Sequence, residues 1–240
     1  MYSMKCPNCK TTDHEEGARF CHICGTKLLS NNDAMAISPK RLHAAFPFDI
    51  MNKSENEIAI DLGLLSGTRW ASHNIGALKP QGTGDYFAWG EIETKEKYTW
   101  KTYLHCENGE KNSCRNMGVG SKIPGSKYDV AHMNWGMFWM MPTRNQFLEL
   151  IDNCTYEWTN AGGRFVSKIN GNSIFLPSAG SFKDTECSGN IGFYWSCEFD
   201  ADNICNAFAL TFDDQAASIG QYYRKNGFVV RPVISSFFFK

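Results

Sequence analysis

The sequence predicts an α+β fold with many short strands, long loops and little helix, preceded by a small metal-binding module. Three observations carry this prediction. Aromatic and β-branched residues gather in short runs at 193–196, 207–212 and 228–233, with turn-forming or polar residues between them. One segment, which follows Thr143, has the pattern of a capped amphipathic helix. Near the N-terminus, four cysteines stand in two C-x2-C pairs.

The two cysteine pairs predict a structural zinc site in residues 1–29. Each C-x2-C turn directs two sulfurs at one ion, and two such turns complete a tetrahedral shell. A redox pair would be expected beside a βαβ pattern, paired disulfides need an oxidising compartment, and catalytic zinc keeps an open position. The segment resembles the short zinc ribbons of many bacterial proteins, so Zn²⁺ is expected as a structural cofactor. The expected ligands are Cys6, Cys9, Cys21 and Cys24.

A linker over 30–57 and a second domain over 58–240 are expected after this module, because polar, turn-like residues lie at both ends of the linker. Within the second domain, residues 91–133 are expected to be mostly irregular. Thr143 is placed to be the N-cap of the helix, with Gln146 completing a capping box. The other expected features are strands at 58–64 and 68–71, a hairpin turn at 170–173 before a strand at 174–177, and an apolar helix face of Phe147, Leu148, Leu150 and Ile151.

Charge and hydropathy favour a cytoplasmic protein. The formal net charge of −1 gives no field that favours nucleic acid, so no nucleic-acid partner is expected. No secretion signal and no run of roughly 18–20 apolar residues is visible, so no membrane span is expected. A surface or secreted location is the alternative. In a reducing compartment the cysteines outside the zinc module are expected to be mostly free thiols: Cys106, Cys114, Cys154, Cys187, Cys197 and Cys205.

Several motifs between residues 60 and 233 stand in one recognisable order. They are DLGLLSGTRWASHNIGA, GDYFAWGE, NWGMFWMMPTRNQFLELI and GNSIFLPSAG, followed by GFYWSC, NAFAL and VVRPV. This order resembles the Fibrobacter succinogenes major paralogous domain, a family abundant in gut Bacteroidetes. That family is similar to the formylglycine-generating (sulfatase-modifying) enzymes, so the resemblance implies a C-type lectin-like fold over 58–240. The chain departs from the family at Met140, where relatives usually have Arg.

The favoured function is a non-catalytic protein that binds a protein or glycan ligand through loops on this scaffold. Many members of the family are surface proteins of unknown ligand. Two alternatives stay open. A sulfatase-modifying-like oxidoreductase would need a reactive cysteine pair, for which Cys197 and Cys205 are candidates and Cys187 a third, although eight residues separate the pair. An intracellular assembly factor would dock on a partner through the zinc ribbon. No G-x-S-x-G, H-E-x-x-H or phosphate-binding glycine loop is present, so an enzyme is not expected.

Calcium binding is a further alternative, because oxygen ligands gather near the C-terminus. No EF-hand-type pattern orders them, and the lectin signatures E-P-N and W-N-D are absent, so solvated acidic loops are the favoured interpretation. The candidate ligands are Glu198, Asp200, Asp202, Asn203, Asp213 and Asp214.

The candidate binding surface follows the run at 207–212. Phe208, Leu210 and Phe212 alternate toward one face of a strand, and the next apolar run starts at Phe228, so the chain between them is predicted to loop over the outside. C-type lectin-like variable proteins diversified by retroelements bind through this C-terminal region; whether this chain belongs to such a system stays open. The candidate ligand-binding residues are Asp213, Asp214, Gln215, Gln221, Tyr222, Tyr223 and Arg224, together with Trp195, an aromatic residue equally typical of a core.

Overall fold

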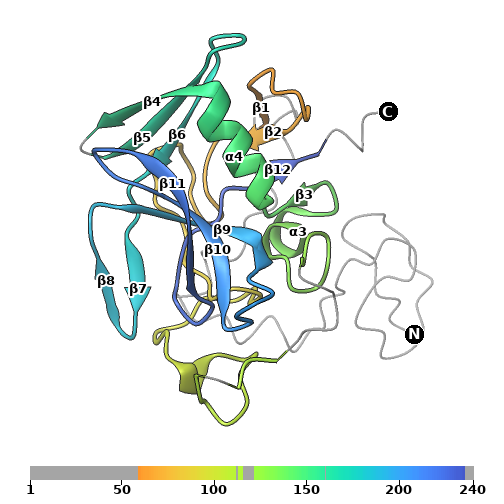
Figure 1. The fold of residues 1–240 in the computed structure, drawn as a ribbon, viewed down its shortest axis with the longest axis vertical. Helices are drawn as coiled ribbons and strands as arrows, with labels where there is room; N and C mark the ends of the chain where they lie inside the picture. Colours follow the sequence, from red (N-terminus) through yellow and green to blue (C-terminus); the bar gives the residue numbers. More distant parts are fainter. Residues whose placement is uncertain (1–58, 112, 116–121, 160, 236–240) are drawn as a thin grey trace, which may run out of the picture. The chain divides into compact units, whose positions relative to one another are not determined.

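The computed structural model describes residues 59–235, except 112, 116–121 and 160 (Figure 1). All of these residues belong to one unit that spans Pro47–Lys240. The four expected zinc ligands and the expected boundaries at 29 and 57 lie outside the described residues.

Small antiparallel sheets with few helices make up the described part of the chain, which agrees with the α+β class (Figure 1). One sheet has the order β1-β2-β12-β3, formed by Ala59–Asp61, Arg69–Ala71, Val233–Ile234 and Trp139–Met140. A second has the order β11-β10-β9, formed by Ala217–Tyr223, Asn206–Phe212 and Gly192–Phe199. The third, β4-β5-β6, comprises Cys154–Thr159, Gly162–Ser167 and Ser173–Pro177, and the fourth pairs β7 (Ser181–Lys183) with β8 (Glu186–Ser188). The helical elements are η3 (Trp100–Thr102), α3 (Val130–Trp135) and α4 (Arg144–Asn153).

Helix α4 begins as the sequence predicts. The Thr143 hydroxyl accepts a hydrogen bond from the Gln146 backbone N–H, and the Gln146 side chain accepts one from the Thr143 backbone N–H. Phe147 and Leu150 are buried, but Leu148, which the sequence placed on the apolar face, is exposed. The set of α4 residues buried against the core is smaller than the set of apolar residues in its sequence, so Leu148 lies at the edge of the contact.

The strand after β10 is the main departure from the sequence-based fold. The polar residues expected to form an outer loop include strand β11, which pairs with β10 from Asn206↔Tyr223 to Phe212↔Ala217. The apolar run at 228–233 is not the third strand of this sheet. Phe228 and Val229 make only isolated bridges, and Val233 alone of this run belongs to β12. The two segments differ in exposure, and this difference explains why their composition was misleading. Strand β11 is a half-exposed edge strand and therefore has mixed polarity, whereas the chain from Phe228 to Ile234 is buried on all sides and is therefore mostly apolar.

The sheet of β9, β10 and β11 separates two cores. Successive side chains of β10 point to opposite faces of this sheet, so alternate residues belong to different cores. Leu210 and Phe212 pack into a core with helix α4 and the sheet of β4, β5 and β6. Ala207 and Ala209 face a second core that contains Trp195. Among the described residues, no helix is both long and apolar enough to cross a bilayer.

The cysteines of the described part are mostly free, with one exception. Cys114 and Cys205 form a disulfide, and the free thiols are Cys106, Cys154, Cys187 and Cys197. The pair suggested for oxidoreductase chemistry, Cys197 with Cys205, is therefore not formed. Cys197 is fully buried, and burial raises the pKa of its thiol.

Candidate ligand-binding site

The residues predicted to form one binding surface divide into three groups in the structure. Asp213, Asp214 and Gln215 lie in the connection between β10 and β11. Gln221, Tyr222 and Tyr223 lie at the far end of β11, and Arg224 and Trp195 are in the interior. Because β11 is seven residues long, its two ends stand about 20 Å apart. The single surface expected from the sequence is therefore not formed.

Arg224 is a core residue and not a ligand contact. Its Nε donates a hydrogen bond to the Tyr103 hydroxyl at 2.7 Å, and its Nη1 donates to the Ile204 carbonyl at 2.8 Å. The guanidinium also lies 4.6 Å from the centroid of the Trp89 ring. Burial lowers the pKa of Arg224, and the neighbouring Tyr103 acts in the opposite direction. The side chain points inward because β11 ends at Tyr223 and the chain turns back into the core at residue 224.

Trp195 is also a core residue, which corrects its place among the candidate ligand contacts. Its indole Nε1 donates to the Phe87 carbonyl at 2.8 Å, and its ring stacks on Phe228 with centroids 4.1 Å apart. No part of the side chain is exposed.

The tyrosines of β11 keep partial exposure. Tyr222 is half-buried and packs edge-on against Phe193. Tyr223 is 37% exposed, with the Trp100 ring 5.5 Å from its own and the Lys111 Nζ 4.6 Å from its centroid. The rings of Trp100 and Phe193 and the Lys111 ammonium therefore cover part of this end of the strand.

The other end of the sheet has a hollow. A cavity of about 400 Å³ opens at the β10–β11 connection, beside the end of β4. Three segments distant in the sequence meet there: β4, the residues before β9, and the residues after β10 (Figure 1). Its lining consists of Trp158, Asn190, Ile191, Asp213 and Asp214. Two of the predicted contact residues, Asp213 and Asp214, are therefore part of it.

The β10–β11 connection is held in a defined shape. The Asp213 carboxylate Oδ1 accepts hydrogen bonds from the backbone N–H groups of Gln215 at 2.9 Å and Ala216 at 3.1 Å. The Asp213 carbonyl accepts one from the Tyr156 hydroxyl of β4. The two backbone donors hold the pKa of Asp213 below its usual range. Asp213 therefore presents a charged carboxylate to the cavity at neutral pH.

The apolar wall of the cavity rests on Phe212. Trp158 is half-buried, and its ring lies 6.4 Å from that of Phe212, edge to face. Gly192 allows this packing, because a Cβ at that position would stand 2.0 Å from Cζ of Phe212. The Phe212 ring thus supports the Trp158 indole on one side, and part of the indole lines the cavity. The sequence gives no signal for Trp158, Asn190 or Ile191, because only folding brings their segments together.

The arrangement suits a ligand that has an apolar face and many hydroxyl groups. An indole offers a flat surface for the C–H face of a sugar ring, and carboxylate and amide oxygens accept hydrogen bonds from hydroxyl groups. A second hollow of about 500 Å³ beside β1 and β6 has no aromatic side chain in its lining.

The residues considered for calcium do not converge on one point. Glu198 pairs with Lys122 at 3.1 Å. The Asp200 carboxylate accepts a hydrogen bond from the Asp202 backbone N–H at 3.0 Å, which shapes a turn. In the part of the chain that the structure describes, no group of three or more His, Cys, Asp or Glu side chains is arranged to hold a metal ion.

Comparison with protein-family models, with curated proteins and with solved structures finds no match to this chain.

Proposed function

We propose that this chain is a non-catalytic binding protein that holds a glycan in the cavity beside Trp158. The observation that carries the proposal is the meeting of one indole, two carboxylates and one amide around a hollow of about 400 Å³. That volume falls within the roughly 300–1,000 Å³ of small-ligand sites. The motif order of residues 60–233 supports a C-type lectin-like scaffold of the Fibrobacter succinogenes type, and the small antiparallel sheets are compatible with it.

The charges and positions of the lining residues argue for recognition through hydroxyl groups. Asp213 is ionised and acts only as an acceptor, so it pairs with donors such as sugar hydroxyls. Asn190 is exposed and offers both an acceptor and a donor. Trp158 offers apolar contact at a small cost in side-chain entropy, because its ring is already packed on Phe212.

Replacement of Trp158 by Ala is expected to weaken glycan binding by about 2 kcal/mol, or roughly thirtyfold in Kd. Asp213→Asn removes the charge but keeps Oδ1 for the turn, and is expected to weaken binding by roughly tenfold. The measurement is a screen of the full chain on immobilised glycans, followed by calorimetric titration of each glycan retained.

The matched control is Tyr223→Ala at the other end of β11, which should bind with unchanged affinity. Thermal unfolding of each variant separates a lost contact from a lost fold. Retention of no glycan on the array, or wild-type affinity in Trp158→Ala, would contradict the proposal.

We also propose that residues 1–29 bind one structural Zn²⁺ through Cys6, Cys9, Cys21 and Cys24, as their spacing predicts. Purified protein is expected to contain one zinc per chain, and Cys21→Ser to lose it. Zinc binding supplies roughly 10–16 kcal/mol to the folding of such modules. The urea midpoint of the second domain should not change, since the two are predicted to fold separately. The zinc content of the purified native protein is measured by mass spectrometry, and a native protein that contains no zinc would contradict the proposed zinc site.

A further inference from the structure

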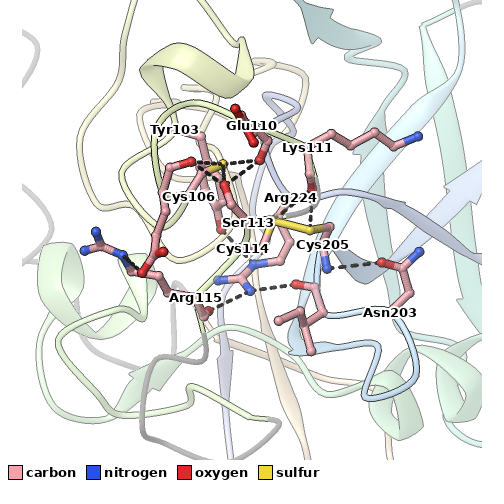
Figure 2. The surroundings of a disulfide bond; sticks show 12 residues. Tyr103, Cys106, Glu110, Lys111, Ser113, Cys114, Arg115, Asn203, Cys205 and Arg224 are labelled. Carbon is pink, nitrogen blue, oxygen red and sulfur yellow. Dashed lines mark hydrogen bonds and ion pairs between the residues drawn. A yellow bond between two sulfur atoms is a disulfide. The ribbon is translucent and has the colours of Figure 1, made fainter.

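The disulfide joins an irregular segment to the sheet of β9, β10 and β11. Cys114 lies in the segment 103–115, and Cys205 lies in the connection from β9 to β10, 91 residues further along the chain (Figure 2). Their Cα atoms are 5.3 Å apart, which is within the usual range for a disulfide. Both residues are buried in a small core that also contains Cys106.

Cys106 stands directly opposite Cys114 in an antiparallel bridge within the same segment. The flanking hydrogen bonds run from the Glu107 N–H to the Ser113 carbonyl at 2.9 Å and from the Arg115 N–H to the His105 carbonyl at 2.8 Å. Cys106 and Cys114 are therefore a non-hydrogen-bonded pair, whose Cα atoms lie roughly 4.5 Å apart. Such a distance permits a disulfide, so Cys114 has two cysteines within bonding reach.

The Cys106 thiol has polar neighbours from its own segment. Cys106 is a free thiol, and its Sγ lies 3.1 Å from the Ser113 hydroxyl (Figure 2). The same Sγ donates a hydrogen bond to the Glu110 carbonyl at 2.6 Å, so the thiol is held within its own segment beside Cys114. The thiolate of such a cysteine is the form that attacks disulfides.

We propose that Cys106, Cys114 and Cys205 form a thiol–disulfide exchange site in which Cys114 alternates between two partners. The Cys106 thiolate attacks the Cys114 sulfur, the Cys106–Cys114 bond forms, and the Cys114–Cys205 bond breaks. Cys205 leaves as a thiolate and takes up the proton that Cys106 released. One disulfide and one thiol are present before and after, so the step needs no external oxidant or reductant.

The two disulfides hold the segment differently. The Cys114–Cys205 bond fixes the segment to the sheet, whereas a Cys106–Cys114 bond closes the segment on itself. In the first state Lys111, from the same segment, lies over the Tyr223 ring. Exchange removes the covalent tie beside this contact, leaving weaker ones such as the 3.4 Å hydrogen bond from Arg224 to the Arg115 carbonyl. The exchange thereby controls access to the β11 end that carries Tyr223, independently of the proposed glycan site.

Tryptic peptides distinguish the two disulfides, because Lys111 lies between Cys106 and Cys114. The full chain is incubated at pH 8 with glutathione disulfide, its thiols are alkylated in acid denaturant, and the disulfide-linked peptides are identified after trypsin digestion. Wild type is expected to yield two linked pairs. Peptide 102–111 joined to 112–115 reports the Cys106–Cys114 disulfide, and peptide 112–115 joined to 184–224 reports the Cys114–Cys205 disulfide. Cys106→Ser should yield only the second pair, and Cys205→Ser only the first. The matched control, Cys187→Ser, should behave as wild type.

Two results overturn the proposal. One is wild type that yields only the Cys114–Cys205 pair after long incubation. The other is Cys205→Ser in which Cys106 and Cys114 stay alkylatable while Cys106→Ser forms its bond. Native trypsin treatment tests the consequence: cleavage after Lys111 should be several-fold faster in Cys205→Ser than in Cys106→Ser, and equal rates contradict control of access by the exchange.

Discussion

Arg224→Ala is expected to destabilise the domain by about 3–5 kcal/mol, rather than to weaken a ligand contact. The substitution removes a fully buried side chain that packs on Trp89 and leaves the carbonyl of Ile204 and the hydroxyl of Tyr103 without their donor. A cavity and unsatisfied polar groups then add to the loss of packing. Equilibrium unfolding in urea, followed by tryptophan fluorescence, measures the change.

Tyr223→Ala is the matched control, because Tyr223 is the adjacent residue and is 37% exposed. It is expected to cost less than about 1 kcal/mol, as surface substitutions do. Arg224→Lys should fall between the two: an ammonium keeps the charge but lacks the planar fork that reaches both acceptors and stacks on the indole. Equal urea midpoints for Arg224→Ala and Tyr223→Ala would show that the buried network contributes nothing.

Local features of the fold could be predicted from the sequence because their determinants lie within a few residues. The capping box of Thr143 and Gln146 is an interaction between neighbours in the chain, and its residue types identify it. Strands β9 and β10 were visible because aromatic residues dominate β9, and large apolar residues alternate with smaller ones in β10. The hairpin between β5 and β6 follows from Asn170 and Gly171, which favour a turn.

Strand β11 could not be predicted, because its sequence resembles a loop. Its residues are mixed in polarity and half-exposed, and their hydrogen bonds to β10 decide the structure. Conversely, the apolar run from Phe228 looked like a strand, but burial on all sides accounts for its composition. In both segments the content of apolar residues follows how deeply the segment is buried. It does not indicate whether the backbone pairs with a neighbouring strand.

Two of the five residues that line the candidate site were visible in the sequence, and the other three depend on long-range contacts. Asp213 and Asp214 were candidates because they follow a strand in a polar stretch. Trp158 reaches the cavity through the packing of β4 on Phe212, and Asn190 reaches it through the pairing of β9 with β10, which sets Gly192 opposite Phe212. Arg224 was misplaced for a related reason: the Tyr103 hydroxyl and the Ile204 carbonyl that accept its hydrogen bonds are distant in the sequence, so the residues next to Arg224 do not indicate its burial.

Asp129→Ala is expected to cost about 3–5 kcal/mol of folding free energy. The Asp129 carboxylate is fully buried and accepts hydrogen bonds from four backbone N–H groups. Two of them, Ala131 at 3.0 Å and His132 at 3.2 Å, belong to the first turn of α3. The others are Gly125 at 3.0 Å and Met141 at 3.1 Å, so one side chain fixes the start of α3 and the chain after β3. Alanine leaves all four donors unsatisfied in the interior.

Comparison with Asp129→Asn separates the hydrogen bonds from the charge. Asparagine keeps one acceptor oxygen but places an amide donor beside other donors, so its cost should be smaller than that of alanine.

Burial raises the pKa of Asp129 above its ordinary value of 3.8. The folded state therefore favours the protonated form, and the stability that this protonation contributes is lost as pH rises through the folded pKa. The advantage of wild type over Asp129→Asn should be largest below about pH 4 and decrease above it. Urea titrations from pH 3 to 7 test this, with Asp152→Ala on the exposed side of α4 as control. An advantage that increases with pH would show that the four donors outweigh desolvation.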